Sequence, residues 1–96
     1  MGSMLKQLRQ MQKELVKAQK ELAKETIVAE AEGGEIRVSI SGDQRLTDLH
    51  ISPEFLASND AKKLSAVLKK AFNQALEDSR NLAQERLGPL SNGMNF

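Results

Sequence analysis

The stretch that most constrains the fold of this chain runs from residue 26 to residue 56. It is the only part with the period-two alternation of β-strands. Within it, Ile36, Val38 and Ile40 alternate with polar neighbours, so one face of this strand is apolar and the other is polar. A weaker alternation precedes it over residues 27–32. An apolar sheet face has to be covered, so the elements on either side must supply the cover.

Two turn signals divide this stretch into three strands. Gly33 and Gly34 tolerate the positive φ angles of a two-residue hairpin turn, and a second turn signal lies at residues 42–44. The third strand is predicted over residues 45–52. The sequence therefore predicts a three-stranded antiparallel meander with one apolar face.

The third strand contains one break in its alternation. Leu49 and Ile51 share a face, but Leu46 is one residue out of phase with them. A β-bulge inserts one extra residue into a strand, so a bulge near Thr47 would bring Leu46 back to the apolar face.

The first helix is predicted from Met4 to Glu25, where glycine and proline are absent. Its apolar residues recur at steps of four and three, as in the seam of a coiled coil: Met4, Leu8, Met11, Leu15, Ala18 and Leu22. A helix of this length reaches about 33 Å, which exceeds the width of a three-stranded sheet. Part of it should therefore project and need a partner helix.

A row of basic residues follows another side of the same helix: Lys6, Arg9, Lys13, Lys17, Lys20 and Lys24. The simpler interpretation is a solvated helix face, supported by Glu14 and Glu21. The more specific interpretation is a line of cations spaced to meet phosphate groups.

The second long helix is predicted from Asp60 to Leu87 and should end at Gly88-Pro89. Its first half has a wide apolar face that suits a helix lying across the sheet. Its second half has a thin apolar face that suits pairing with the projecting part of the first helix. Before it, Ser52 caps a short helical turn, and Phe55 and Leu56 are expected to enter the core.

These elements predict one α+β domain over residues 4–90. Residues 1–3 resemble a remnant of an expression vector, and residues 91–96 are expected to form a flexible tail. The core is small for a monomer, the seam of the first helix is unpaired and strand edges are open, so a homodimer is expected.

Composition argues against catalysis and against a membrane span. The chain has no cysteine and one histidine, His50, so no metal set or catalytic pair is complete, and we expect no enzyme, cofactor or small-molecule substrate. Neither a signal peptide nor a spanning apolar run is present, which predicts a cytoplasmic protein without membrane contact.

Charge is segregated along the chain although the net charge is only +1. Residues 1–25 carry six basic and three acidic side chains, for a net charge of +3, and residues 60–96 carry six basic and four acidic, for +2. Residues 26–59 carry two basic and six acidic side chains, for −4. Basic helices therefore flank an acidic sheet.

Several segments in this order resemble the YbaB/EbfC family of bacterial nucleoid-associated proteins. They are MLKQLRQMQKEL (4–15), EIRVSISG (35–42), HISPEFL (50–56), AFNQALEDS (71–79) and LSNGM (90–94). The sequence departs from the family pattern at Glu35, where a glycine is common, and in a shorter tail without the proline-rich end. The resemblance implies a helix–sheet–helix fold, a tight homodimer with helical ends projecting like tweezers, and DNA binding with little or modest sequence preference.

The leading hypothesis is a dimeric nucleoid protein that binds double-stranded DNA, organises the bacterial chromosome and modulates gene expression. From the basic row we assign phosphate contacts to Lys6, Arg9, Lys13 and Lys17, with Arg80 and Arg86 as lesser candidates. The alternative is an adaptor whose basic helices meet an acidic partner, such as a recombination or replication factor, without binding DNA.

Overall fold

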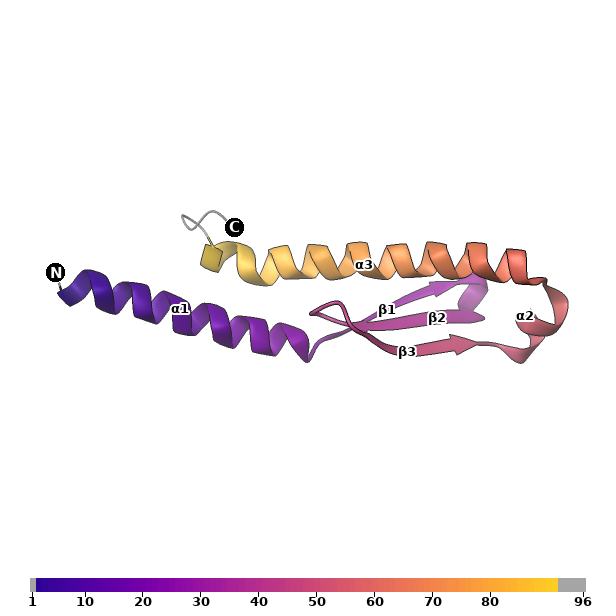
Figure 1. The fold of residues 1–96 in the computed structure, drawn as a ribbon, viewed down its shortest axis with the longest axis horizontal. Helices are drawn as coiled ribbons and strands as arrows, with labels where there is room; N and C mark the ends of the chain where they lie inside the picture. Colours follow the sequence, from indigo (N-terminus) through magenta and orange to yellow (C-terminus); the bar gives the residue numbers. More distant parts are fainter. Residues whose placement is uncertain (1, 92–96) are drawn as a thin grey trace.

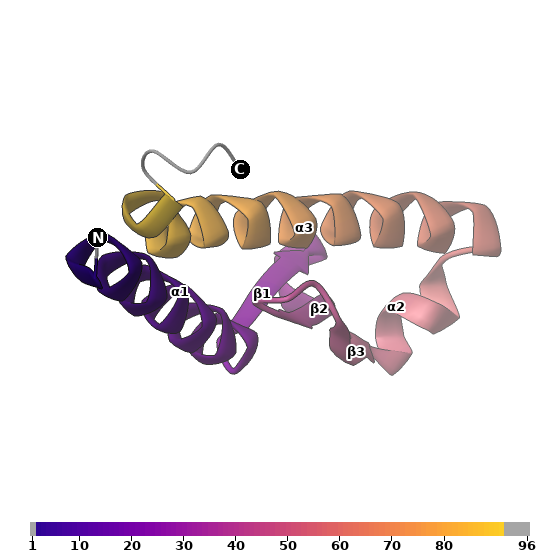
Figure 2. The same cartoon turned by 60° about the vertical axis from the view of Figure 1, so that its left-hand side comes forward.

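The computed structural model describes residues 2–91, which form an elongated molecule of 67 × 20 × 17 Å (Figure 1). The elements in chain order are α1 (Gly2–Ala23), β1 (Thr26–Ala31), the 3-10 turn η1 (Glu32–Gly34), β2 (Ile36–Ser41), β3 (Leu46–Ile51), α2 (Pro53–Ser58) and α3 (Ala61–Ser91). This confirms the predicted order of a helix, a three-stranded antiparallel sheet and a long helix. Figure 2 shows α3 lying over the sheet while α1 leads away from it.

The core forms where the first half of α3 crosses the sheet. The strand order is β1-β2-β3, so β2 is central, and its residues Ile36, Val38 and Ile40 are completely or almost completely buried. α3 packs against β1 and β2. The buried cluster comprises Ala29, Ile36, Val38, Ile40, Phe55, Val67, Ala71 and Ala75. This confirms that the first half of the second long helix covers the apolar face.

The connection between β1 and β2 contains the predicted turn at Gly33 and Gly34. The strand ladder closes at Ala31 and Ile36, which leaves four residues between them. Glu32, Gly33 and Gly34 all have positive φ angles, of 54°, 66° and 94°. The Glu35 amide donates a hydrogen bond to the Glu32 carbonyl oxygen at 3.3 Å, which closes a turn with Gly33 and Gly34 as its two central residues. The predicted positive φ angles at both glycines are confirmed, and the strand pairing stops one residue pair before the turn because Glu32 also has a positive φ angle.

The predicted bulge in the third strand is present. Ser39 pairs with Asp48 and Ile40 pairs with Leu46, so Thr47 is the extra residue. The Thr47 hydroxyl donates a hydrogen bond to the Ser39 carbonyl oxygen at 3.1 Å. The bulge places Leu46 opposite Ile40, on the same face as Leu49 and Ile51.

Two helices end differently from the prediction. α1 spans Gly2–Ala23, which is two residues earlier at both ends than predicted, and it includes two of the residues assigned to a vector remnant. α3 continues through Gly88 and Pro89 to Ser91. A proline removes one N–H donor from a helix, and so close to the end of α3 the freed carbonyl can bond to water. Residues 92–96 of the predicted flexible tail lie outside the described residues.

The short helix α2 is capped as expected but only half of its apolar pair is buried. The Ser52 hydroxyl accepts a hydrogen bond from the Phe55 amide at 3.0 Å, and Phe55 is buried. Leu56 is exposed, which corrects the prediction that both side chains enter the core. Asp60 caps α3, since its carboxylate accepts a hydrogen bond from the Lys63 amide at 2.8 Å.

The seam of α1 packs against α3 at one end only. Leu22 is 5% exposed and is the only buried residue of Gly2–Ala23. Met11, Leu15 and Ala18 are half-buried. Towards the N-terminus the exposure rises to 51% at Leu8 and 70% at Met4. The predicted pairing of the two helices is therefore confirmed for the C-terminal part of α1 and not for its first two turns.

Candidate nucleic-acid interface

The basic row of α1 lies on the side of the helix opposite to its apolar seam, because the two rows are half a turn apart at 3.6 residues per turn. Lys6, Arg9, Lys13 and Lys17 are all exposed. Within residues 2–91, none of these four side chains forms an ion pair with a carboxylate. Four cations on one line of a helix are therefore available to an external anion.

A shallow hollow lies beside this row. It is lined by Val16, which is exposed, together with Arg9, Gln12, Lys13, Lys17 and Lys20. The aliphatic stems of lysine and arginine can cover apolar surface while their charged ends remain in water. The surface thus combines a small apolar contact with several cations.

The structure does not bring Arg80 and Arg86 into line with this row. Arg80 is exposed and lines a different hollow, between α1 and α3, where Gln19 and Leu22 are the contributions from α1. Arg86 is engaged within the chain, since its Nη2 atom lies 2.9 Å from the Glu25 Oε1 atom. Of the six candidates, four form one surface, one stands apart and one is paired.

Further exposed lysines lie on α3, at Lys62, Lys69 and Lys70. Lys63 differs from them because its Nζ atom is 3.7 Å from the Glu32 carboxylate. The sequence showed these residues as two lysine pairs, but only the structure separates the paired lysine from the others.

The outer face of the sheet is polar, as the strand alternation predicted. Glu30, Arg37 and His50 are neighbours in register across the three strands, and all are exposed. The Arg37 Nε atom lies 3.6 Å from a Glu30 carboxylate oxygen. Over residues 2–91, His, Cys, Asp and Glu nowhere gather in the threes that a metal ion requires.

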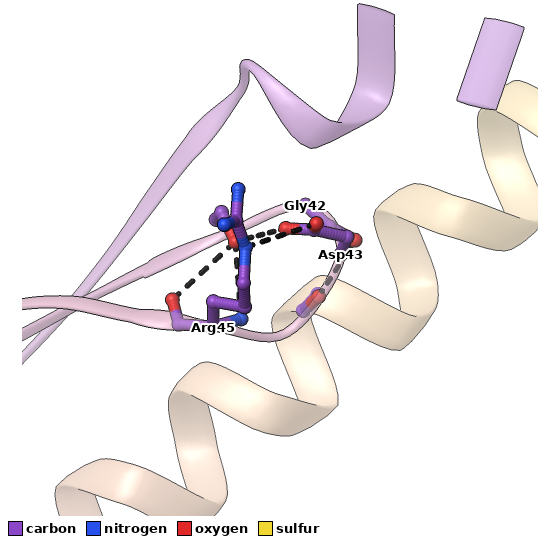
Figure 3. A network of polar contacts seen from close by, with 5 residues as sticks. Gly42, Asp43 and Arg45 are labelled. Atoms are coloured by element: carbon purple, nitrogen blue, oxygen red, sulfur yellow. Dashed lines mark hydrogen bonds and ion pairs between the residues drawn. The ribbon is translucent and has the colours of Figure 1, made fainter. Parts of the chain in front are cut away.

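The turn between β2 and β3 meets both long helices, and sequence reasoning gave it no role beyond a turn (Figure 3). The Ser41 hydroxyl bonds to the Asp43 carboxylate, and the Arg45 Nε atom lies 3.1 Å from the same carboxylate. The hydrogen bond from Ser41, followed by the interactions with Arg45, lowers the pKa of Asp43 below its ordinary value. The only sequence signal for this site was a glycine at the end of an apolar strand.

Gly42 occupies the centre of this turn. It is buried, and a Cβ atom added there would overlap the Leu22 carbonyl oxygen and lie 2.8 Å from its carbonyl carbon. Its N–H group donates to the Glu25 carbonyl oxygen at 3.0 Å. Its carbonyl oxygen accepts a hydrogen bond from the Ser79 hydroxyl at 3.4 Å, and Ser79 is fully buried.

No helix in the described part of the chain has the length and apolar character needed to cross a membrane.

Comparison with known proteins finds similarity over most of the length of the chain. A nucleoid-associated protein of Corynebacterium jeikeium is 37% identical over 94 residues, which is 98% of this chain and 90% of that protein. One of Pelodictyon phaeoclathratiforme is also 37% identical over 94 residues, covering 98% of this chain and 83% of the relative. An uncharacterized protein of Helicobacter pylori shares the fold, with a TM-score of 0.68, 23% identity, and coverage of 81% of this chain and 90% of its own. The profile of the YbaB/EbfC DNA-binding family matches residues 1–94, and the chain belongs to this family.

Proposed function

We propose that this protein is a non-enzymatic nucleoid-associated protein that binds double-stranded DNA as a homodimer with little sequence preference, organising the bacterial chromosome and modulating gene expression. The observation that carries the proposal is the exposed row of Lys6, Arg9, Lys13 and Lys17, which is free of internal ion pairs within residues 2–91. Membership of a DNA-binding family and relatives named nucleoid-associated protein support it.

The spacing of the row suits a phosphate backbone. Steps of three and four residues along a helix correspond to about 5 Å along its axis. A straight helix cannot follow a groove for its full length, so each α1 helix meets about two or three phosphates. The two α1 helices of a dimer together meet about four to six. Arg80 adds a weaker contact from α3. Arg86 contributes only if its guanidinium leaves Glu25.

Little sequence preference follows from the kind of contact. Hydrogen bonds and ion pairs to phosphates fix the position of a protein on a duplex and carry no direct sequence information. Phe55 is buried and Phe72 is half-buried within the core, so among residues 2–91 neither phenylalanine is available to wedge between bases. Binding by charge alone is therefore the simplest use of this surface.

The apolar surface that α3 leaves open supports the homodimer. β3 carries Leu46 and Leu49 on the core-facing side of the sheet, and both are exposed. Gln74 and Lys70 of α3 lie with Glu30 beside β1, so Phe72 and Leu76, on the other flank of α3, face the β3 side. A second copy seated here would bury this surface and leave both α1 helices projecting, in a tweezer-like arrangement.

Electrophoretic mobility shift on two duplexes of unrelated sequence, at about 50 and 200 mM salt, tests the proposal. Four to six phosphate contacts predict a loss of affinity of about 10²–10³-fold between the two salt concentrations, equal for both duplexes. Sedimentation equilibrium of the free protein should give the mass of a dimer. Binding that ignores salt, or absence of binding, would overturn the DNA proposal and favour an adaptor for an acidic protein partner.

A further inference from the structure

The helix α1, which carries the basic row, packs against the rest of the molecule along its C-terminal part and most closely at its base. Leu22 is buried at the C-terminal end of α1, and exposure rises steadily towards Met4. A helix of this length extends about 33 Å, so a rotation of 10° at its base moves its tip by about 6 Å. The position of the basic row relative to α3 therefore depends strongly on the contacts that surround Leu22, with a further contribution from the half-buried Met11, Leu15 and Ala18.

Gly42 supplies the first of these contacts. The Glu25 amide donates to the Leu22 carbonyl oxygen at 3.0 Å, and the Gly42 amide donates to the Glu25 carbonyl oxygen at 3.0 Å. The end of α1 therefore rests directly on the backbone of the β2–β3 turn. An added Cβ atom at residue 42 would also lie 2.9 Å from the Leu22 Cγ atom, so any larger residue must push α1 away.

Ser79 supplies the second contact, from α3. Its hydroxyl donates to the Gly42 carbonyl oxygen, which leaves both polar backbone groups of Gly42 bonded, one towards α1 and the other towards α3. Ser79 is fully buried, so a larger side chain would separate α3 from the turn. Gly42 is thus the point at which the end of α1, the sheet and α3 meet.

We infer that Gly42 and Ser79 are positioning residues for DNA binding: they fix the angle at which α1 leaves the body of the protein and thereby the place where its basic row meets phosphates. Neither residue touches DNA. The inference rests on the proposed function for its consequence in DNA binding, but the angle itself is measurable without DNA.

The experiment measures that angle by pulsed electron–electron double resonance. The chain has no cysteine, so nitroxide labels at Gln7→Cys on α1 and Asn73→Cys on α3 are unique, and both positions are exposed. Labelled protein is diluted with unlabelled protein so that only the distance within one chain is recorded. We expect one narrow distance distribution for the parent protein and a shift or broadening of several ångströms for Gly42→Ala.

Gly88→Ala is the matched control. It is the same substitution on α3, and an added Cβ atom there meets nothing within 4 Å. It should leave both the distance and DNA affinity unchanged. Ser79→Ala removes only the hydroxyl, so it decides the question if Gly42→Ala does not fold. It should broaden the distribution while thermal unfolding remains cooperative.

DNA titrations on the same variants complete the test. If α1 leaves the body of the protein at a different angle, its basic row meets fewer phosphates. Gly42→Ala and Ser79→Ala should therefore bind DNA more weakly and show a shallower dependence of log affinity on log salt. An unchanged distance distribution in folded Gly42→Ala or Ser79→Ala would overturn the inference. A changed distance with unchanged DNA affinity and salt slope would also overturn it. If the parent protein does not bind DNA, the proposed function fails. The distance measurement still reports whether Gly42 and Ser79 fix the angle of α1.

Discussion

Val38 and Leu49 face each other in register across β2 and β3, yet Val38 is 0% exposed and Leu49 is 41% exposed. The two side chains lie on the same face of the sheet, so the exposed fraction changes from one strand to the adjacent strand. The cause is the path of α3, which packs against β1 and β2 and leaves β3 uncovered. The border of the core therefore runs between the second and third strands.

The burial of Val38 predicts a large effect of a polar substitution. Val38→Ser should lower the free energy of unfolding by about 1–3 kcal/mol, because apolar burial is reduced and a hydroxyl is left without a partner. Ser39→Val, on the outer face, should change it little. Urea denaturation followed by circular dichroism measures both. Equal damage from the two substitutions would mean that the outer face is covered as well.

Leu49 should matter for self-association more than for the fold. Leu49→Glu would place a carboxylate in the proposed dimer interface, so the dissociation constant of the proposed dimer should rise at least about tenfold while the chain stays folded. Val28→Glu is the matched control, since Val28 is exposed on the opposite face of the sheet. Sedimentation equilibrium distinguishes them. Dissociation by Val28→Glu instead would place the interface on the outer face.

Removing charge from the α1 row should weaken binding to every duplex alike. The triple variant Lys6→Gln, Arg9→Gln and Lys13→Gln keeps helix propensity, and its slope of log affinity against log salt should fall by about 0.9 for each phosphate that the variant no longer neutralises. Replacing Lys62, Lys69 and Lys70 with Gln removes the same amount of charge from α3. This variant should retain most of the slope of log affinity against log salt. If the two variants behave in the opposite way, the DNA surface lies on α3.

Arg80 and Arg86 should respond differently to the same substitution. Arg80 makes no ion pair in the described part of the molecule, so Arg80→Gln should reduce the salt slope slightly without affecting stability. Arg86→Gln breaks a half-exposed pair with Glu25, which should lower stability by at most about 1 kcal/mol and leave the slope unchanged. A larger loss of slope in Arg86→Gln would show that Arg86 exchanges Glu25 for a phosphate.

Asp43 should contribute to acid sensitivity. Its pKa is lowered in the folded protein, mainly by the hydrogen bond from Ser41, so its ionised form favours folding. This contribution is present above the ordinary pKa of an aspartate and is lost as the pH falls through the lowered pKa. Asp43→Asn should therefore lose less stability than the parent protein as the pH falls below about 4. Ser41→Ala should reproduce this flattening, and an unchanged pH profile in both variants would contradict it.

The sheet could be predicted because the pattern that specifies each strand lies in residues that are neighbours in sequence. The alternation of Ile36, Val38 and Ile40 assigns their faces, and the phase break at Leu46 located the bulge at Thr47. The two glycines likewise located the turn between β1 and β2. The positive φ angle of Glu32, which ends the pairing at Ala31, has no signal in the alternation.

The candidate site was predictable only as a row along one helix. The spacing of Lys6, Arg9 and Lys13 determines that they share a side, whatever surrounds the helix. The pairing of Arg86 with Glu25 joins residues distant in sequence, so no spacing rule shows it. The same holds for Gly42 and Ser79, because the meeting of the end of α1, the β2–β3 turn and α3 appears in the sequence only as one glycine and one serine.

The position of α3 after the three strands has a consequence for synthesis. The three strands are neighbours in sequence and can pair as soon as they leave the ribosome, but the residues that cover them, Val67, Ala71 and Ala75, are made later. Until residue 75 has emerged, the apolar face of β2 remains open to water. A chain stalled before that point exposes Ile36, Val38 and Ile40 together. Chaperones and proteases then encounter an apolar sheet face that α3 covers in the complete fold.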